Sequence, residues 1–247
     1  MFGLALGSFG FGARGWGGQL ILALGMTLGV TLAAMATGAV LGALVALAKL
    51  SPSRIARVIG NAYTTLFRGI PELLVIYLIY FGGSGAVASV VSLFGIHAFV
   101  SIPSFLAGAV AVGFISGAYQ AEVYRGAYRS LARGEIEAAR AIGMPPMMRF
   151  RRIIGPQVIR AALPGLGNVW QLTIKDSALI SVTGLAELMR TSEVGARSTH
   201  QYFGFYIVGG CLYLLLTALS NGAFGSMENR VRRSLPGGTM RRDAGRR

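Results

Sequence analysis

Charged residues stand inside stretches of this chain that are otherwise apolar. Arg68 and Glu72 lie in one such stretch, Glu122 closes a second, and Lys175 and Asp176 lie in a third. A charge at the centre of a bilayer costs about 2.5–3.5 kcal/mol on insertion scales, so such residues are expected to face a partner or a water-filled cavity. The chemistry they offer is recognition of a charged ligand.

The residues needed for catalysis are missing. The chain has two histidines and one cysteine, and its carboxylates do not cluster, so no metal site or nucleophilic triad can be nominated. Its two lysines, Lys49 and Lys175, stand in Ala-Lys-Leu and Ile-Lys-Asp, which excludes a Gly-Lys-Ser/Thr phosphate loop. We therefore expect no enzymatic activity and no cofactor bound by this chain. His97 and His200 are isolated, and we expect both on the external surface.

The elements that carry the charges are predicted to be membrane spans. Apolar residues make up 53% of the 247 residues and charged residues only 13%, against about 25% charged in a typical soluble domain. A spanning helix needs about 20 apolar residues. We expect an all-α polytopic membrane protein of a single domain, with five spans at about 20–48, 58–81, 102–121, 161–186 and 202–227. Residues 84–100 are apolar but short, which favours a re-entrant or surface segment.

The basic residues predict the orientation of the chain, because short basic segments remain in the cytoplasm. Lys and Arg gather after the first span, after the third span and in the tail at 230–247. With five spans, this distribution places the N-terminus outside and the C-terminus inside. It also explains most of the formal net charge of +14, so we expect no nucleic-acid partner.

The long connector at about 134–156 is predicted to form a compact helical knob on the cytoplasmic side. Residues 135–142 favour a helix, with acidic residues first and Arg140 near the end, which suits the helix dipole. Gly143 is expected to stop this helix, and Pro145 and Pro146 prevent its continuation. By composition alone, the knob fits a groove on a soluble partner and an anionic lipid surface equally well.

The connector resembles the EAA loop of ATP-binding-cassette importer permeases. That pattern is Glu-Ala-Ala, a glycine, then a hydrophobic-proline element, which here are Glu137, Ala138, Ala139, Gly143 and Pro156. Flanking motifs resemble the polar amino-acid branch of histidine, lysine-arginine-ornithine and opine permeases, over roughly residues 17–233. These motifs are Phe67–Leu74, Ala121–Gly126, Ala162–Gln171, Lys175–Leu179 and Leu219–Gly222. The sequence departs from the commoner Ile-Leu-Pro in reading Ile154-Gly155-Pro156.

The resemblance implies a permease subunit that imports a polar, basic amino acid or an opine across the bacterial inner membrane by alternating access. Its partners would be a second, homologous permease (a distinct sequence is favoured), two ATP-binding subunits that hold ATP and Mg, a periplasmic binding protein and membrane lipid. The EAA loop would be the coupling helix on the ATPase. Carried over, the contact residues are Glu137, Ala138, Ala139, Arg140, Gly143 and Met144.

Within the spans, Glu72 is the candidate for the cationic side chain of the substrate. Arg68 and Glu72 are four residues apart, so on a continuous helix they would share a face and could instead form an internal pair. Gly69 and Pro71 can break that helix and leave backbone groups to line a cavity.

Further candidates lie in the third and fourth spans. Glu122 and Arg125 predict an interfacial ion pair, with a role in a gate or cavity as the alternative. Lys175 is expected to anchor its helix to a carbonyl or to Glu122. Asn168, Trp170 and Gln171 are candidates for polar and aromatic contacts to the substrate, and for Trp170 helix packing is the favoured interpretation.

Two other classes of protein stay open at this point. A secondary transporter driven by an ion gradient would show internal repeats, which are not evident, and five spans are few for that class. A membrane enzyme lacks a site, as argued above. Uptake that requires ATP and ignores ionophores would separate the permease from the secondary transporter.

Overall fold

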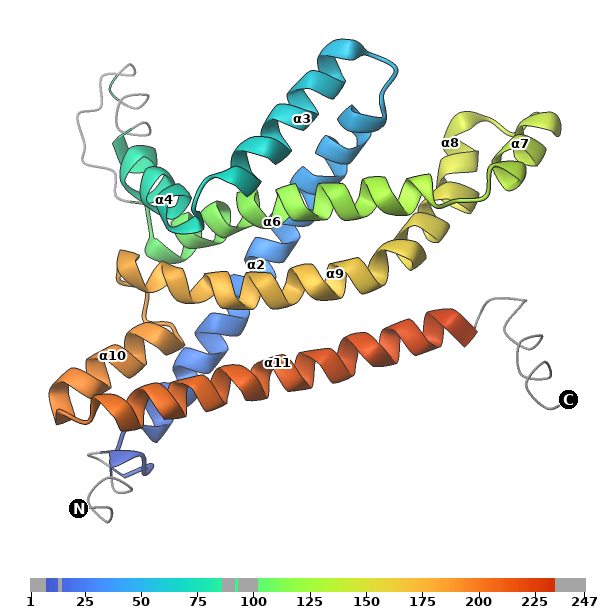
Figure 1. Ribbon diagram of the computed structural model, residues 1–247. Coiled ribbons are helices and arrows are strands. Elements are labelled where there is room, and N and C mark those ends of the chain that lie inside the picture. Colours follow the sequence, from blue (N-terminus) through green and yellow to red (C-terminus); the bar gives the residue numbers. More distant parts are fainter. Residues whose placement is uncertain (1–7, 13–14, 86–91, 93–101, 234–247) are drawn as a thin grey trace, which may run out of the picture.

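The structure is a computed structural model that describes residues 8–12, 15–85, 92 and 102–233. Every regular element within these ranges is helical, which confirms the predicted all-α class. The longest helices are α2 (Gly17–Leu50), α6 (Ser104–Arg129), α9 (Gly155–Ser177) and α11 (Tyr202–Arg233). In Figure 1, α6, α9 and α11 run side by side while α2 crosses them obliquely.

Helix α2 packs closely on α6 because small residues meet at the crossing. A Cβ atom added to Gly42 would lie 2.9 Å from the Gly117 carbonyl oxygen and 2.9 Å from the Gln120 Cβ. The same atom on Gly38 would lie 2.6 Å from the Gln120 Nε2. Without water to drive helices together in a membrane, such close approach supplies the packing energy.

The second predicted span is broken. Helix α3 (Arg54–Gly69) ends at Gly69, Pro71 precedes α4 (Glu72–Tyr77), and a π-helical turn, η1 (Leu78–Gly82), follows. The chain bends by 107° between the two helical segments. Proline cannot donate a helical hydrogen bond and disfavours helical backbone in the residue before it, which accounts for the break.

Helix α6 lies at the centre of the fold. Val112 of α6 is fully buried in a cluster with Val30 of α2 and Ile76 of α4. Ile180, from the 3-10 helix η3 (Ala178–Thr183), completes this cluster. The core therefore joins elements that are up to 150 residues apart in the sequence.

The fourth predicted span, 161–186, corresponds to α9 and η3. The chain then turns at Gly184, whose φ of 84° suits glycine, and enters α10 (Leu188–Thr199). Sequence analysis does not predict α10. The carboxylate of the buried Glu187 caps it by accepting hydrogen bonds from the backbone N–H of Met189 and of Arg190 and from the Tyr213 hydroxyl, at 2.7–2.8 Å.

Three described helices, α2, α6 and α11, are long and apolar enough to cross a membrane, and the bent pair of α3 and α4 can supply a fourth crossing. Helix α9 carries polar residues and does not meet the same measure of length and apolarity. The count of five spans stays a prediction. Most of the segment at 84–100, including His97, lies outside the described residues.

Candidate functional site

The connector between α6 and α9 forms the predicted helical knob. Helix α7 spans Arg133–Ala141, close to the predicted 135–142. It stops at Gly143, as predicted, with a φ of 74°. The Gly143 N–H donates to the Arg140 carbonyl (2.9 Å) and the Met144 N–H to the Ala139 carbonyl (3.0 Å). This is the Schellman pattern, which satisfies the last carbonyls of a helix.

Helix α7 rests against the first turn of α9. Ala139 is buried there, whereas Glu137, Ala138 and Arg140 remain exposed. Glu135 accepts a hydrogen bond from Gln157, which ties the two helices together. A hollow of about 520 Å³ lies at this junction. Its lining includes Ala138, Ala139, Ile142, Met144, Ile153 and Pro156.

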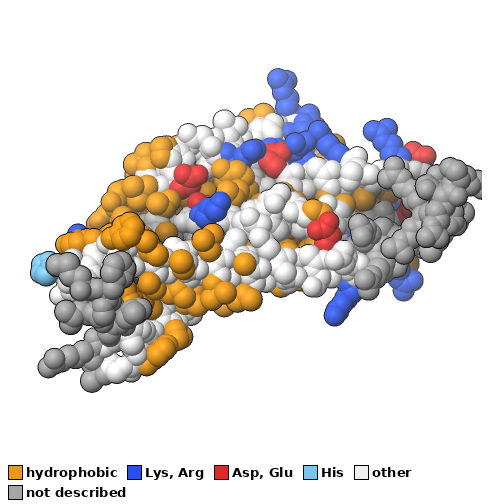
Figure 2. All heavy atoms as spheres, turned by 60° about the horizontal axis from the view of Figure 1, so that its bottom comes forward, with side chains coloured by type: hydrophobic (Ala, Val, Ile, Leu, Met, Phe, Trp, Pro, Cys, Tyr) orange, Lys and Arg blue, Asp and Glu red, His pale blue; other side chains and the backbone are white. Residues whose placement is uncertain are grey.

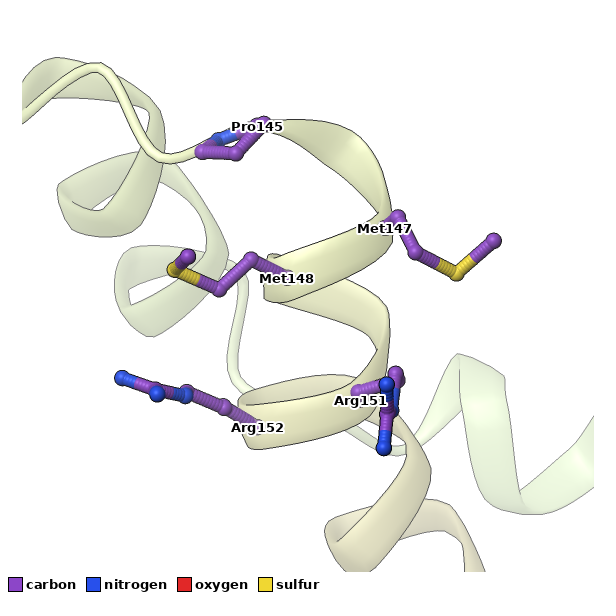
Figure 3. A pocket seen from close by; sticks show the side chains of 5 residues that line it. All are labelled: Pro145, Met147, Met148, Arg151 and Arg152. Carbon is purple, nitrogen blue, oxygen red and sulfur yellow. The ribbon is translucent and has the colours of Figure 1, made fainter.

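A second hollow of about 530 Å³ lies beside helix α8 (Pro146–Arg149) and the π-helical turn η2 (Phe150–Ile154). Figure 3 shows Met147 and Met148 on the turn above Arg151 and Arg152. The large apolar side chains of Ile142 and Met147 are 77% and 70% exposed. The knob therefore presents apolar side chains rimmed by arginines, which is the composition of a docking surface.

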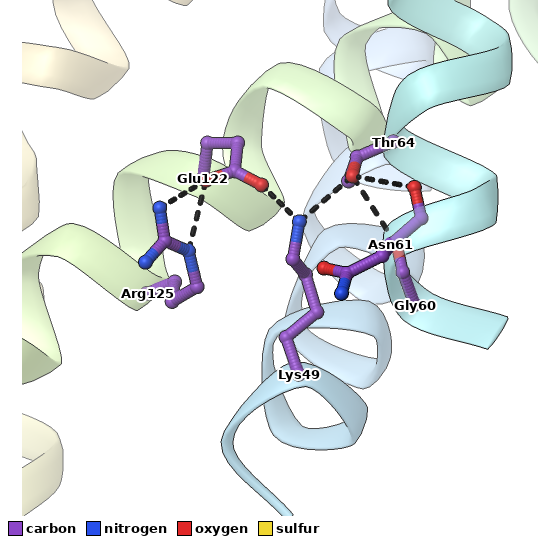
Figure 4. A network of polar contacts seen from close by, with 6 residues as sticks. All are labelled: Lys49, Gly60, Asn61, Thr64, Glu122 and Arg125. Atoms are coloured by element: carbon purple, nitrogen blue, oxygen red, sulfur yellow. Dashed lines mark hydrogen bonds and ion pairs between the residues drawn. The ribbon is translucent and has the colours of Figure 1, made fainter. Parts of the chain in front are cut away.

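A network of charges joins α2, α3 and α6 (Figure 4). The Lys49 ammonium donates to the Glu122 carboxylate and to the Thr64 hydroxyl, the latter at 2.7 Å. The Arg125 guanidinium donates to the other oxygen of Glu122 through Nε (2.9 Å) and Nη2 (2.6 Å). The predicted Glu122–Arg125 ion pair is confirmed. The alternative in which Lys175 pairs with Glu122 is wrong, because Lys49 and Arg125 hold both carboxylate oxygens.

Arg68 and Glu72 lie on opposite sides of the break between α3 and α4. No ion pair joins them in the part of the chain that the structure describes, so the alternative of an internal pair is not supported. The Arg68 guanidinium instead lies 5.2 Å from the centre of the Tyr119 ring. Glu72 occupies the first turn of α4 and is half-buried.

Asp176, at the end of α9, was not among the predicted ligand-binding residues. It lies just before η3, which packs against α4, the helix that begins with Glu72, and the negative charge of Glu72 acts on it. The adjacent Lys175 offsets part of the negative charge of Asp176, so the site combines two acids with one cation. The signal in the sequence was the position of Asp176 within an apolar stretch, but nothing in the sequence shows that it approaches Glu72.

The other three candidates do not gather at one point. Asn168 is exposed on α9, and the Gln171 amide donates to the Asn221 side chain of α11 at 2.7 Å. Trp170 is 7% exposed and packs on Phe224, with ring centres 6.1 Å apart. Packing is thus what the structure shows for Trp170. Among the described residues, no group of His, Cys, Asp and Glu could hold a metal ion.

The long apolar helices and the exposed knob between them are the features of a helical membrane protein that docks on a partner. The family described as "Binding-protein-dependent transport system inner membrane component" matches residues 38–233. The chain belongs to this family.

Relatives and a solved structure extend the match. The chain is 54% identical over 226 residues to the octopine transport system permease protein OccQ of Rhizobium meliloti, which covers 92% of this chain and 95% of the relative. It is 37% identical to the histidine/lysine/arginine/ornithine transport system permease protein HisQ of Escherichia coli (strain K12), over 87% of this chain and 94% of that protein. A crystal structure of an amino acid ABC transporter with histidines matches with a TM-score of 0.73 and 33% identity, over 87% of this chain and 95% of that chain.

Proposed function

We propose that this chain is one of two permease subunits of an ATP-driven importer for a basic amino acid or an opine. The observation that carries the proposal is the exposed knob of α7 and α8 in a chain of the binding-protein-dependent family. Relatives that transport octopine and basic amino acids support the substrate class. The second subunit is a homologous permease of different sequence, and two ATP-binding subunits and a periplasmic binding protein complete the importer.

The chain crosses the inner membrane five times, with α9 as the fourth span and α11 as the last, an external N-terminus and a cytoplasmic C-terminus. The position of the basic side chains supports this orientation. In Figure 2 hydrophobic side chains gather toward one end of the visible face and Lys and Arg toward the other. Arginines of the knob and its surroundings lie on α7, on α8, on η2 and on the first turns of α9: Arg133, Arg140, Arg149, Arg151, Arg152 and Arg160.

The knob is the coupling element. ATP-driven closure of the ATPase pair moves α7, and the bundle rocks so that its cavity opens alternately to the two sides. Glu137, Ala138 and Arg140 supply exposed contacts, and Gly143 and Met144 shape the end of the helix. ATP and Mg bind in the ATPase subunits.

Glu72 binds the cationic end of the substrate, and Asp176 strengthens the negative charge there. The support is the position of Glu72 at the break between α3 and α4, where the chain cannot form regular helical hydrogen bonds, and the packing of α4 against η3, which follows Asp176. Substituting Glu72→Gln preserves the shape and removes the charge.

Uptake by liposomes that hold the complete importer and a loaded binding protein tests this function. We expect uptake to require ATP and to ignore ionophores; uptake that collapses with a proton uncoupler at constant ATP contradicts the proposal and favours a secondary transporter. The Glu72→Gln variant should take up cationic substrate at least tenfold more slowly with unchanged basal ATP hydrolysis. A parallel loss of both activities assigns Glu72 a structural role.

A further inference from the structure

One face of α3 is polar along most of its length. Arg57, Asn61, Thr64 and Arg68 recur at intervals of three or four residues, so they lie on one side of the helix. Ile59 and Leu66, more than 50% exposed, lie away from this line. Because α3 is the first half of a broken membrane crossing, its polar face requires water or protein opposite it.

A polar cavity of about 500 Å³ lies along this face. It is bounded by α3, by α6 and by the last turn of α2. Its lining residues are Lys49, Asn61, Thr64, Thr65, Arg68, Gly69, Tyr119 and Glu122.

The charges around the cavity do not balance. Glu122 is its one acid and is already shared between Lys49 and Arg125. These two cations and Arg68 therefore leave an excess of positive charge against a single carboxylate. Such a cavity attracts an anion, and the surrounding low dielectric strengthens the attraction.

Arg68 is the cation that remains available. Its side chain is exposed, and no ion pair or hydrogen bond ties it to another described residue. Its guanidinium carbon lies 5.2 Å from the centre of the Tyr119 ring, within the range of a cation–π contact, which leaves the N–H groups of Arg68 available to a ligand. A planar guanidinium with free edges is suited to bidentate binding of a carboxylate.

We propose that the cavity between α3 and α6 binds a carboxylate of the transported substrate, with Arg68 as the contacting residue. This inference rests on the proposed function and extends it to the other end of the substrate. Arg68 and Glu72 flank the bend, so a molecule with a carboxylate at one end and a cation at the other finds an opposite charge on each side. An opine carries a second carboxylate on the substituent of its α-nitrogen, so the excess positive charge favours opines over simple amino acids.

Binding to the nucleotide-free importer in nanodiscs, without the binding protein, tests the inference. The probes are radiolabelled octopine, arginine and argininamide, which carry two, one and no carboxylates. We expect affinity to fall in that order in the unaltered protein. The Arg68→Gln variant should bind arginine at least tenfold more weakly and argininamide with unchanged affinity. Arg68→Lys keeps the positive charge but lacks the paired N–H donors of the guanidinium, so it should recover part of the lost affinity for arginine.

Arg54→Gln is the matched control, because Arg54 is an exposed arginine in the first turn of the same helix and lies outside the cavity. It should bind all three probes like the unaltered protein. Equal weakening of arginine and argininamide by Arg68→Gln overturns the inference, as does an unaltered protein that binds the acid and the amide equally. ATP-driven uptake measured in parallel separates the two proposals. If uptake occurs but does not discriminate between arginine and argininamide, only the carboxylate site is overturned. If ATP drives no uptake, the proposed function itself is overturned.

Discussion

Helix α6 has two sides that differ in how they meet their neighbours. Toward α2 it is sealed, because Gly117 lies against Gly38 and Gly42 at distances that leave no room for a Cβ atom. Toward α3 the contact is only partial: Phe67 packs on Phe114, and beside this contact polar side chains such as Arg68 line a cavity. In a membrane, small residues thus determine where a bundle closes, and polar residues determine where it stays open. The transport path is expected on the hollow side.

Adding volume to the sealed side should have the largest effect. In Gly42→Leu, a branched side chain must enter the contact with Gly117 and Gln120. We expect a loss of about 3 kcal/mol in the free energy of unfolding, or roughly 10 °C in the midpoint of thermal unfolding in detergent. Gly25→Leu on the same helix is the control, because no atom lies within 4 Å of its added Cβ. Equal midpoints of thermal unfolding for the two variants would show that α2 and α6 are not closely packed at Gly42.

Removing the ammonium group at the edge of the hollow side should have a moderate effect. Lys49→Met keeps the length of the side chain but leaves Glu122 with Arg125 as its remaining partner. A hydrogen bond to a charged group contributes about 2 kcal/mol. We therefore expect the free energy of unfolding, measured by thermal unfolding, to fall by about that amount. Lys175→Met provides the comparison, because Lys175 is exposed at the end of α9. A Lys49→Met protein as stable as Lys175→Met would mean that the network does not hold α2 to α6.

The smallest effect is expected from Trp170→Phe. The Trp170 Nε1–H is buried without a hydrogen-bond partner, so its removal relieves a cost that offsets the lost ring contacts. The free energy of unfolding, followed through the midpoint of thermal unfolding, should therefore change by less than about 1 kcal/mol. A loss above about 2 kcal/mol would reveal a partner for this N–H in the assembled protein.

The features that could be predicted from the sequence are those written in local patterns. The apolar runs predicted α2, α6 and α11, and the sequence from Glu135 to Gly143 predicted a helix and its stop. Contacts between distant segments could not be predicted. Lys49 and Glu122 are 73 residues apart, so nothing in the sequence indicates that they pair. Lys175 was considered as a partner of Glu122, a place that Lys49 and Arg125 take in the structure.

The broken second span shows the same limit. Gly69 and Pro71 indicated where the helix would end, but not the direction in which the chain would continue. That direction places Glu72 near Asp176 and separates it from Arg68. Helix α10 was missed because its buried face consists mostly of small and polar residues, such as Thr191, Ser192 and Gly195, and not of an apolar run. The carboxylate that caps it also bonds Tyr213 of another helix.

The most direct test of the central claim is a crosslink from α7 to the ATPase. A cysteine at Ala138, an exposed position on α7, would carry a photoreactive probe in the assembled importer, with Cys211 replaced by serine. We predict a crosslinked product that contains the ATP-binding subunit and a yield that changes when ATP binds. A probe that reaches lipid or the periplasmic binding protein, and never the ATP-binding subunit, would contradict the account.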